Sequence, residues 1–266
     1  MGGVELVRCP LLLGIPGVAH VFSTRHVDGT ADFDLGDAAD GTPGTLERRR
    51  RLCRAAGLGD GPPVVLKQVH GRRIVSAAHG SSDGAVEADG VLAPRRGAPP
   101  PVLSVRSADC LPLLLADEDG RFVAAVHAGW RGTARGIARR AVALLVGQGI
   151  PAGRLRAALG PVAGPCCYEV GSEVLDAVAG ACGAPARELQ AVSGRGGITL
   201  DLAHANRLQL LAAGLCRASI SSAAECTVCS GRYFSYRRDG SAAGRQMALI
   251  GWKAEPGGDG GRGATP

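Results

Sequence analysis

The chain has 266 residues and a mass of 27.0 kDa, enough to bury a hydrophobic core without disulfide bonds. Hydrophobic residues make up 45% of it and charged residues 20%, as in ordinary globular proteins, which excludes wholesale disorder. No apolar run reaches the roughly 18 residues that a membrane helix needs, and the N-terminal residues lack the pattern of a signal peptide. We therefore expect a cytoplasmic protein without a membrane partner.

The formal net charge is +6, and nearly all basic residues are arginine, because Lys67 and Lys253 are the only lysines. Gly, Ala, Arg and Pro, which share GC-rich codons, are all abundant, so we interpret the basic balance as compositional bias rather than as a nucleic-acid footprint. Aromatic residues make up only 3% of the chain and offer few stacking platforms for single strands. The arginine run at 48–51 is interpreted as the solvated face of a helix. A nucleic-acid partner is disfavoured, and the pattern carries no information on oligomeric state.

The nine cysteines are odd in number and have no secretory signal beside them, which indicates reduced thiols. Some are expected to be buried as small apolar groups. The pair Cys226-x-x-Cys229 has the spacing of half a zinc site or of a redox dithiol. A second CxxC is missing from the sequence, so we assign no function to this pair.

Apolar runs and helical periodicities alternate along the chain. The pattern predicts a long loop at 28–43, a proline-rich connection at 95–101, strands at 64–67, 73–77, 102–105, 111–116, 122–127 and 155–159, helices at 133–148, 170–179 and 202–215, and two strand segments within 232–252. This mixture predicts an α+β fold, a layered α/β sandwich with mixed sheets flanked by helices, as a single domain over residues 1–253. The Gly/Pro-rich residues 254–266 are expected to be a disordered tail.

Three predicted strands are each flanked by a polar turn that carries a potential metal ligand, namely His70, Cys110 and His127. Glycines beside both histidines allow a close approach of other groups. One thiolate and two imidazoles could form a tetrahedral zinc site whose open fourth position takes water or a substrate oxygen. The same residues also allow a metal-free alternative, with Cys110 as nucleophile and His127 as base of a Cys–His hydrolase. The residue types do not separate these two hypotheses.

Two basic segments could bind an anion. The run 129–133 is expected to open a helix, where free N–H groups and Arg131 would converge on a phosphate, although Arg131 could instead cap the helix or form an ion pair. Arg237 and Arg238 follow aromatic residues and could hold a phosphate or stack on a base, or could be solvated arginines of a hairpin.

Several motifs recur together and in this order in one known family. They are FSTR at 22–25, LKQVHG at 66–71, EADG at 87–90, SADCLPLLLAD at 107–117, HAGWRGT at 127–133, LGPVAGPCCYEVG at 159–171, FSYRRDG at 234–240 and GRQ at 244–246. Over about residues 21–252 the chain resembles the laccase-domain family, once called multicopper polyphenol oxidoreductases and also peptidoglycan editing factors. The resemblance implies metal ligands at His70, Cys110 and His127.

The resemblance further implies a zinc-dependent purine nucleoside phosphorylase acting on adenosine, inosine, guanosine and S-methyl-5′-thioadenosine, with inorganic phosphate as co-substrate and an additional adenosine deaminase activity. Copper is disfavoured, because the chain has only six histidines and no HxH pair. The alternatives are a Cys–His hydrolase or amidase acting on cell-wall precursors and, less favoured, a polyphenol oxidase.

Within this hypothesis Lys67, Arg131 and Arg238 are expected to bind phosphate, with Gln68 and Arg237 as further substrate contacts. His70, Cys110 and His127 would take part in catalysis through the metal. Asp109 is the candidate proton carrier, or else caps its turn as an Asx residue. Residues 26–29 and 33–36 depart from the family pattern. The adjacent Cys166 and Cys167 belong to that pattern and are interpreted as packing residues rather than as a disulfide.

Overall fold

The computed structural model describes residues 3–29, 33–36, 44–80, 84–96, 100–192 and 197–254. The tail predicted at 254–266 lies outside these residues apart from Ala254, and so does most of the loop predicted at 28–43. In the part of the chain that the structure describes, no helix is long and apolar enough to span a membrane.

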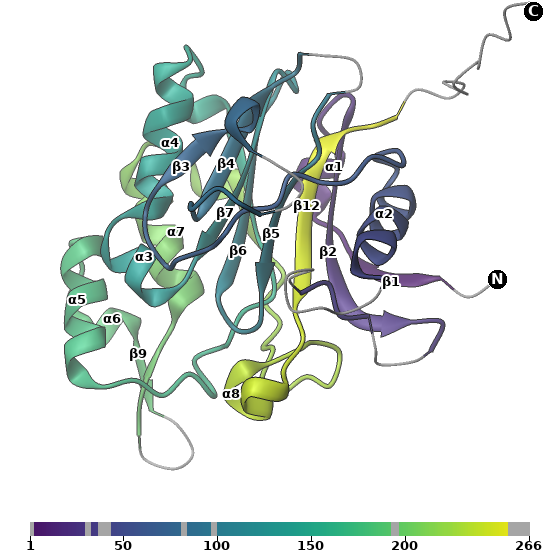
Figure 1. Ribbon diagram of the computed structural model, residues 1–266. Coiled ribbons are helices and arrows are strands. Elements are labelled where there is room, and N and C mark those ends of the chain that lie inside the picture. Colours follow the sequence, from purple (N-terminus) through teal and green to yellow (C-terminus); the bar gives the residue numbers. More distant parts are fainter. Residues whose placement is uncertain are drawn as a thin grey trace, which may run out of the picture.

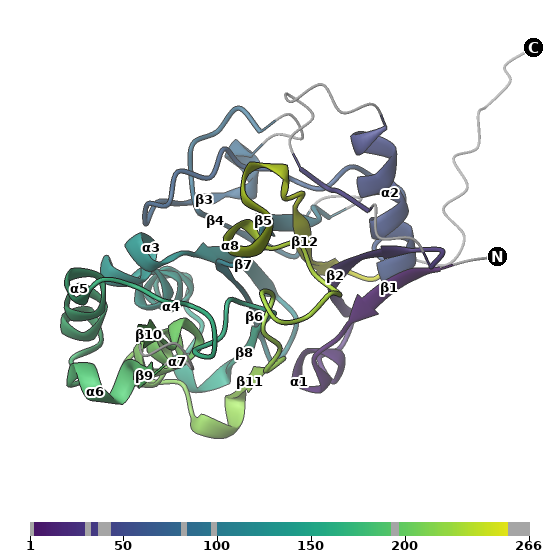
Figure 2. The same cartoon turned by 90° about the horizontal axis from the view of Figure 1, so that it is seen from below.

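Two β-sheets form the centre of the molecule (Figures 1 and 2). The smaller is antiparallel throughout, in the order β1 (Val4–Val7), β2 (Val18–Val27), β12 (Gln246–Trp252) and β5 (Leu103–Ser107). The larger is mixed, in the order β11 (Ile220–Ser222), β8 (Leu155–Leu159), β6 (Leu111–Asp117), β7 (Phe122–Ala128), β4 (Gly90–Pro94) and β3 (Ile74–Ser76). Its two outer strands run parallel to their neighbours and its inner pairs are antiparallel. A separate short pair joins β9 (Gln190–Val192) to β10 (Ile198–Leu200).

Helices cover the outer faces of both sheets. The helices of the described residues are α1 (Pro10–Leu13), α2 (Thr45–Ala56), α3 (Trp130–Ala134), α4 (Ile137–Gly147), α5 (Ser172–Cys182), α6 (Ala186–Leu189), α7 (Leu202–Ala212) and α8 (Tyr236–Asp239). Helix α2 packs on the smaller sheet, whereas α4, α5 and α7 pack on the larger one (Figure 1). The order of layers is therefore helix, sheet, sheet, helices. This arrangement confirms the predicted layered α/β sandwich with mixed sheets in a single domain.

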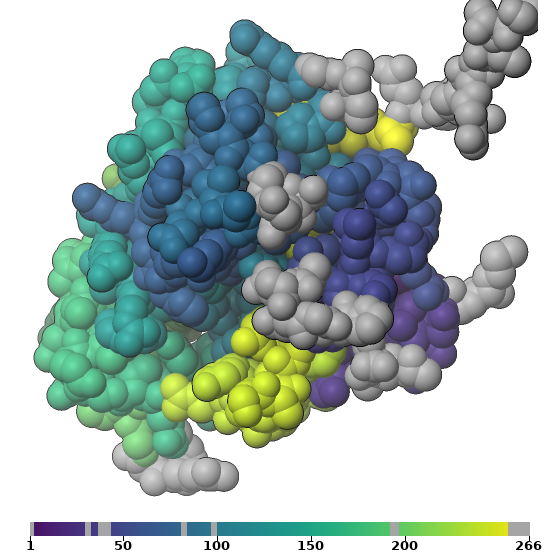
Figure 3. All heavy atoms as spheres, in the orientation of Figure 1, coloured from purple at the N-terminus to yellow at the C-terminus, as the bar shows by residue number. Residues whose placement is uncertain are grey.

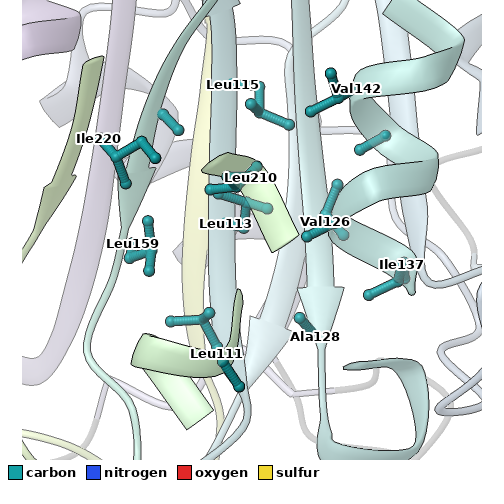
Figure 4. Packing of buried hydrophobic residues seen from close by; sticks show 14 of the residues in the cluster. Leu111, Leu113, Leu115, Val126, Ala128, Ile137, Val142, Leu159, Leu210 and Ile220 are labelled. Atoms are coloured by element: carbon teal, nitrogen blue, oxygen red, sulfur yellow. The ribbon is translucent and has the colours of Figure 1, made fainter. Parts of the chain in front are cut away.

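The strands read as continuous apolar runs because both faces of each sheet are covered. On β6, Leu113 and Leu115 face the helical layer and pack in one cluster with Val142 of α4 (Figure 4). The alternate residues Leu114 and Ala116 belong to the cluster between the two sheets. A shift of one residue would exchange these two sets of side chains, so the two covered faces specify the register.

Two predicted elements differ from the structure. The single helix expected at 133–148 is two helices, because Gly136 has a left-handed φ of +74° and separates α3 from α4. The prediction of a strand before Asp239 is wrong, because the short helix α8 lies there. The hydroxyl of its N-cap residue, Ser235, accepts the N–H group of Arg238. Sequence periodicity is a weak guide for a four-residue helix that one cap defines.

Two further expectations were wrong in detail. Residues 64–67 make only isolated bridges, one of which joins Val64 to Leu103. The arginine run lies on α2 as expected, but Arg49 is buried rather than solvated. Its guanidinium donates to the carbonyl of Leu35, because this segment of chain crosses the helix and needs a donor there.

A buried histidine on β2 links stability to pH. His20 Nε2 accepts the N–H group of Cys9 at 2.8 Å, and its Nδ1 has no partner among the described residues. Burial, assisted by the charge of Arg8, lowers the pKa of His20 to about 4. As the pH falls, His20 is therefore protonated near pH 6.5 in the unfolded chain but only near pH 4 in the folded chain.

We expect the free energy of unfolding to fall by about 3 kcal/mol between pH 6.5 and pH 4 because of His20 alone. Denaturant unfolding across this range should show a smaller pH dependence for His20→Gln, which keeps an acceptor for Cys9. The exposed His79→Gln is the control and should keep the dependence of the parent chain. An unchanged pH dependence in His20→Gln would contradict this assignment.

Candidate metal site and anion-binding cavity

The ends of neighbouring strands place a cysteine beside a histidine. Strands β6 and β7 pair Leu111 with Ala128. Cys110, directly before β6, therefore lies next to His127 at the end of β7. The two residues meet at one edge of the larger sheet because antiparallel neighbours begin and end at the same edge.

The second histidine comes from the loop before β3. That strand runs parallel to β4, whose first residue Gly90 pairs with Val126 of β7. Asp89, just before β4, accepts the backbone N–H groups of His70 at 2.9 Å and Gly71 at 2.6 Å. These bonds hold His70 in a left-handed conformation with φ +57°, so its ring faces the other two ligands.

The donor atoms of His70, Cys110 and His127 all lie within 4.8 Å of one another. The two imidazole rings meet edge to face, with their centroids 4.9 Å apart. Gly129 lies against the group, since a Cβ there would be 3.0 Å from the sulfur of Cys110 and 3.1 Å from the ring of His70. One thiol and two imidazoles at this spacing fit the three protein ligands of an open tetrahedral metal site.

The electrostatics of this group favour a thiolate. Burial by itself would raise the pKa of Cys110, but the charge of His127 and hydrogen bonds from both histidines lower it to about 6. Burial would likewise lower the pKa of His127, whereas Cys110 and Asp89 raise it. A thiolate is the form that binds metal ions and also the form that acts as a nucleophile.

Asp89 orients His127, a role that the sequence analysis did not assign. His127 Nδ1 lies 2.9 Å from Asp89 Oδ1, which leaves Nε2 as the nitrogen available to a metal. Burial opposes ionisation, but His127 and the N–H groups of the 69–71 loop keep the pKa of Asp89 below its usual value. The feature of the sequence that could have indicated this role is the EADG motif, which places an acidic residue and a glycine directly before an apolar run.

Replacing Asp89 by asparagine should lower metal affinity by roughly 10- to 100-fold, the usual effect of removing a carboxylate behind a histidine ligand. Competition with a chelator of known affinity would measure this loss. Asp117→Asn is the matched control, since Asp117 is equally buried but bonds the N–H group of Phe122 at the far end of β6. Equal affinities in the two variants would contradict the role of Asp89.

A cavity of about 490 Å³ opens above the three ligands. Its lining combines the ligands with arginines and aromatic rings, contributed by Gln68, His70, Arg106, Ser107, Ala108, Asp109, Cys110, His127, Trp130, Arg131, Tyr168, Tyr236, Arg237 and Arg245. Three of the five Trp and Tyr residues of this aromatic-poor chain lie there. Helix α8, within the yellow C-terminal part of Figure 3, forms one side of the cavity.

Four arginines make this cavity strongly cationic. Arg106 is buried and donates to the carbonyl of Leu66 at 2.8 Å. Its burial, together with the charge of Arg245, lowers the pKa of Arg106 to about 10. The Arg131 guanidinium lies 4.5 Å above the ring of Trp130, and that of Arg237 lies 5.2 Å above the ring of Tyr168. Four positive charges lining one cavity favour the binding of an anion there.

Of the predicted substrate contacts, Gln68, Arg131 and Arg237 line the cavity. The side-chain amide of Gln68 is engaged with the backbone of Arg106, donating to its carbonyl and accepting its N–H group, both at 2.8 Å. Gln68 thus joins its loop to β5. Arg131 is exposed at the start of α3, where it can reach a ligand in the cavity.

Lys67 and Arg238 are absent from the lining of the cavity. The Lys67 ammonium forms an exposed ion pair with Glu87, with 2.8 Å between Nζ and Oε1. The Arg238 guanidinium donates to the carbonyls of Thr227, Val228, Ser230 and Tyr233 and pairs with Asp239. Their positions give no support to the predicted contacts with phosphate.

Asp109 lines the cavity with both carboxylate oxygens engaged. One accepts the hydroxyl of Thr227 at 2.6 Å and the other the N–H group of Arg237 at 2.6 Å. Asp109 itself has a left-handed φ of +90°. These bonds favour the structural alternative for Asp109, and proton transfer by this residue stays a prediction.

Residues 19–253 match the family described as multi-copper polyphenol oxidoreductase laccase. The chain belongs to this family. It is 36% identical over 255 residues to a purine nucleoside phosphorylase of Deinococcus radiodurans, covering 94% of this chain and 93% of that protein. It is 31% identical to adenosine deaminase RL5 of an unknown prokaryotic organism, covering 93% of this chain and 98% of that protein.

The fold is shared with solved structures of the same kind. The crystal structure of YlmD from Geobacillus stearothermophilus superposes with a TM-score of 0.77 at 30% identity, covering 96% of this chain and 100% of that one. The protein of that name is called a purine nucleoside phosphorylase and is 34% identical to this chain over 233 residues, 85% of each. A Neisseria meningitidis protein matches with a TM-score of 0.78 at 29% identity, covering 95% and 100%.

The family description names copper, yet the histidines of this chain are dispersed. Only His70 and His127 join a potential metal group in the described residues, and the other group found there consists of cysteines. Arg106, Arg245 and Tyr168 of the cavity were not among the predicted site residues. The available signals were an arginine within the apolar run before SADC and the motifs GRQ and CCYEVG.

Proposed function

We propose that the chain is a zinc-dependent purine nucleoside phosphorylase of the cytoplasm that also deaminates adenosine. The observation that carries this proposal is the cationic, aromatic-lined cavity above a thiol and two imidazoles within 4.8 Å. The names of the relatives support the substrate class. The nine cysteines, all free in the structure, suit a reducing compartment.

His70, Cys110 and His127 would hold the zinc ion, in agreement with the thiolate that their arrangement favours. Zinc bound there would supply Lewis-acid chemistry toward a water molecule or a substrate oxygen in the cavity. Asp89 keeps His127 in the tautomer with Nε2 free. The N–H groups of the 69–71 loop donate to the carboxylate of Asp89, so His70 would be held in position before a metal binds.

The arginines of the cavity would bind the phosphate co-substrate. In phosphorolysis a phosphate oxygen bonds to C1′ of the ribose, and the bond from C1′ to the purine nitrogen breaks. The departing base takes a proton. Arg106 and Arg245 lie at the junction of β5 and β12, and Arg131 and Arg237 lie on helices that border the same cavity. Their charges would orient the phosphate and offset the negative charge that develops as the base departs.

Trp130, Tyr168 and Tyr236 would bind the purine. Two of these rings already stack against arginines, so a flat base could extend either stack. A mixed apolar and cationic cavity matches a nucleoside, whose base is aromatic and whose ribose carries hydroxyls. Deamination of adenosine needs water rather than phosphate and would use the metal side of the cavity.

The half-buried Cys110 and the buried His127 also support the Cys–His hydrolase hypothesis as a second candidate. The pair has the shifted pKa values of a nucleophile and its base. Metal dependence separates the two candidates, because a nucleophilic cysteine would work without metal and would be blocked by an alkylating reagent.

The deciding experiment measures the zinc content of the purified protein and then its activity on adenosine, inosine, guanosine and S-methyl-5′-thioadenosine. We expect release of free base only with both inorganic phosphate and metal, and formation of inosine from adenosine without phosphate. An amidase panel with cell-wall peptides and a phenol oxidation assay are run in parallel. Turnover in those assays, with none on nucleosides, would overturn the proposal.

A further inference from the structure

A second group of potential metal ligands lies outside the cavity. Cys166 and Cys167 come from the loop after β8, and Cys226 and Cys229 from the loop after β11. The four sulfurs all lie within 4.8 Å of one another. The sulfur of Cys229 is 3.3 Å from that of Cys166 and 3.1 Å from that of Cys167. Cys166 is exposed and Cys167 only half-buried, so the interpretation of this adjacent pair as packing residues is wrong for Cys166.

The topology explains why two distant pairs meet. Strands β8 and β11 are parallel neighbours, so both loops leave the same edge of the sheet. Val162 and Cys226 continue the pairing as an isolated bridge, and the N–H group of Thr227 donates to the carbonyl of Val162 at 3.0 Å. The two cysteine-bearing loops therefore run side by side. A four-cysteine metal site usually has two CxxC pairs. Here Cys166 and Cys167, adjacent in the sequence, take the place of the second pair.

The backbone around Cys226 is arranged for a thiolate. The N–H group of Gly164 donates to the sulfur of Cys226 at 3.2 Å, and those of Val228 and Cys229 also donate to it. Such bonds stabilise negative charge on sulfur. A Cβ at position 164 would lie 3.1 Å from Cys226 Cβ and 3.4 Å from Cys166 Sγ, so a glycine is needed for the close approach of the loops.

An arginine holds one of the two cysteine-bearing loops in place. Arg238 donates to three carbonyls of the loop that holds Cys226 and Cys229, those of Thr227, Val228 and Ser230. Its guanidinium also pairs with Asp239, so Arg238 holds this loop in place rather than offsetting the charge of the thiolates. Arg238, which does not line the cavity, therefore supports the loop that carries Cys226 and Cys229.

We infer that Cys166, Cys167, Cys226 and Cys229 bind a structural zinc ion, separate from the metal proposed in the cavity. Four thiolates leave no open position, which is the pattern of structural rather than catalytic zinc. Thiolate ligands also select zinc over the hard cations. The inference does not depend on the proposed function of the cavity.

The zinc would stabilise one wall of the cavity. Tyr168 follows Cys167 directly and lines the cavity, and Thr227 follows Cys226 and donates to Asp109 at 2.6 Å. Loss of the ion is expected to free these two loops and so to weaken nucleoside binding. The residues of this wall are positioning residues, and KM should change more than kcat when the ion is lost.

The test is a count of zinc ions per chain in protein expressed with added zinc and freed of loose metal by gel filtration. We expect about two ions in the parent chain and about one in each of two variants, Cys110→Ala and the double variant Cys226→Ser with Cys229→Ser. Cys216→Ser is the matched control, because Cys216 is exposed and outside both groups. It should keep about two ions.

Cobalt substitution identifies which site remains. Cys110→Ala loaded with Co²⁺ should keep the intense thiolate-to-cobalt absorption of a four-sulfur site, and the double variant should lose most of it. If the double variant fails to fold, the spectrum of folded Cys110→Ala alone decides. Cys110→Ala without bound metal would overturn the inference. Two disulfides, seen as five instead of nine titratable thiols after anaerobic unfolding with chelator, would overturn it too.

Discussion

Replacing Cys110 by alanine is expected to lower the kcat/KM of phosphorolysis by at least about 100-fold and to remove the metal from the cavity. Loss of a residue behind a metal ligand already costs about 10- to 100-fold in affinity or activity, and loss of a ligand should cost more. The two remaining imidazoles would hold the ion weakly. Because Cys110 lies directly before β6 and belongs to none of the core clusters, the fold should persist.

The measurement combines metal analysis with kcat/KM for inosine at saturating phosphate. Cys182→Ala is the control, since Cys182 is a half-buried thiol on α5 that bonds the carbonyl of Ala205 and lies outside both metal groups. It should keep the parent activity. Full metal content in Cys110→Ala with abolished turnover would favour the nucleophile hypothesis. Unchanged content and turnover together would exclude Cys110 from the site.

Arg131→Ala is expected to raise the phosphate concentration needed for phosphorolysis by roughly 10- to 150-fold. This range corresponds to one charge-assisted hydrogen bond of about 1.5–3 kcal/mol. Arg131 lines the cavity at the start of α3, and the free N–H groups at the start of a helix favour a negative charge. Its guanidinium is exposed, so alanine leaves no buried polar group unpaired.

Deamination of adenosine needs no phosphate and should fall much less in Arg131→Ala. Arg135→Ala, an exposed arginine one turn further along that is absent from the cavity lining, is the matched control and should leave both reactions unchanged. Equal losses of phosphorolysis and deamination in Arg131→Ala would indicate that Arg131 binds the nucleoside. Phosphate binding would then rest on Arg106, Arg237 and Arg245.

The sequence by itself determined the residues of the candidate metal site and the class of fold. His70 and Cys110 stand in polar turns and His127 at the end of an apolar run, signals that need only a few neighbouring residues. The long apolar runs of β6 and β7 likewise predict strands covered on both faces. Such features can be predicted from the sequence because adjacent residues determine where strands end and turns form.

Only the tertiary structure decided what surrounds those ligands. Strand β12 pairs Gln246 with Ser107 of β5, and this contact across well over a hundred residues brings Arg245 close to Arg106. The pairing of β8 with β11 does the same for the four cysteines. The order of strands in a sheet depends on which apolar faces become buried together. No short stretch of sequence determines this order. The charge of the cavity and the second metal group therefore become visible only in the tertiary structure, where the strands have paired.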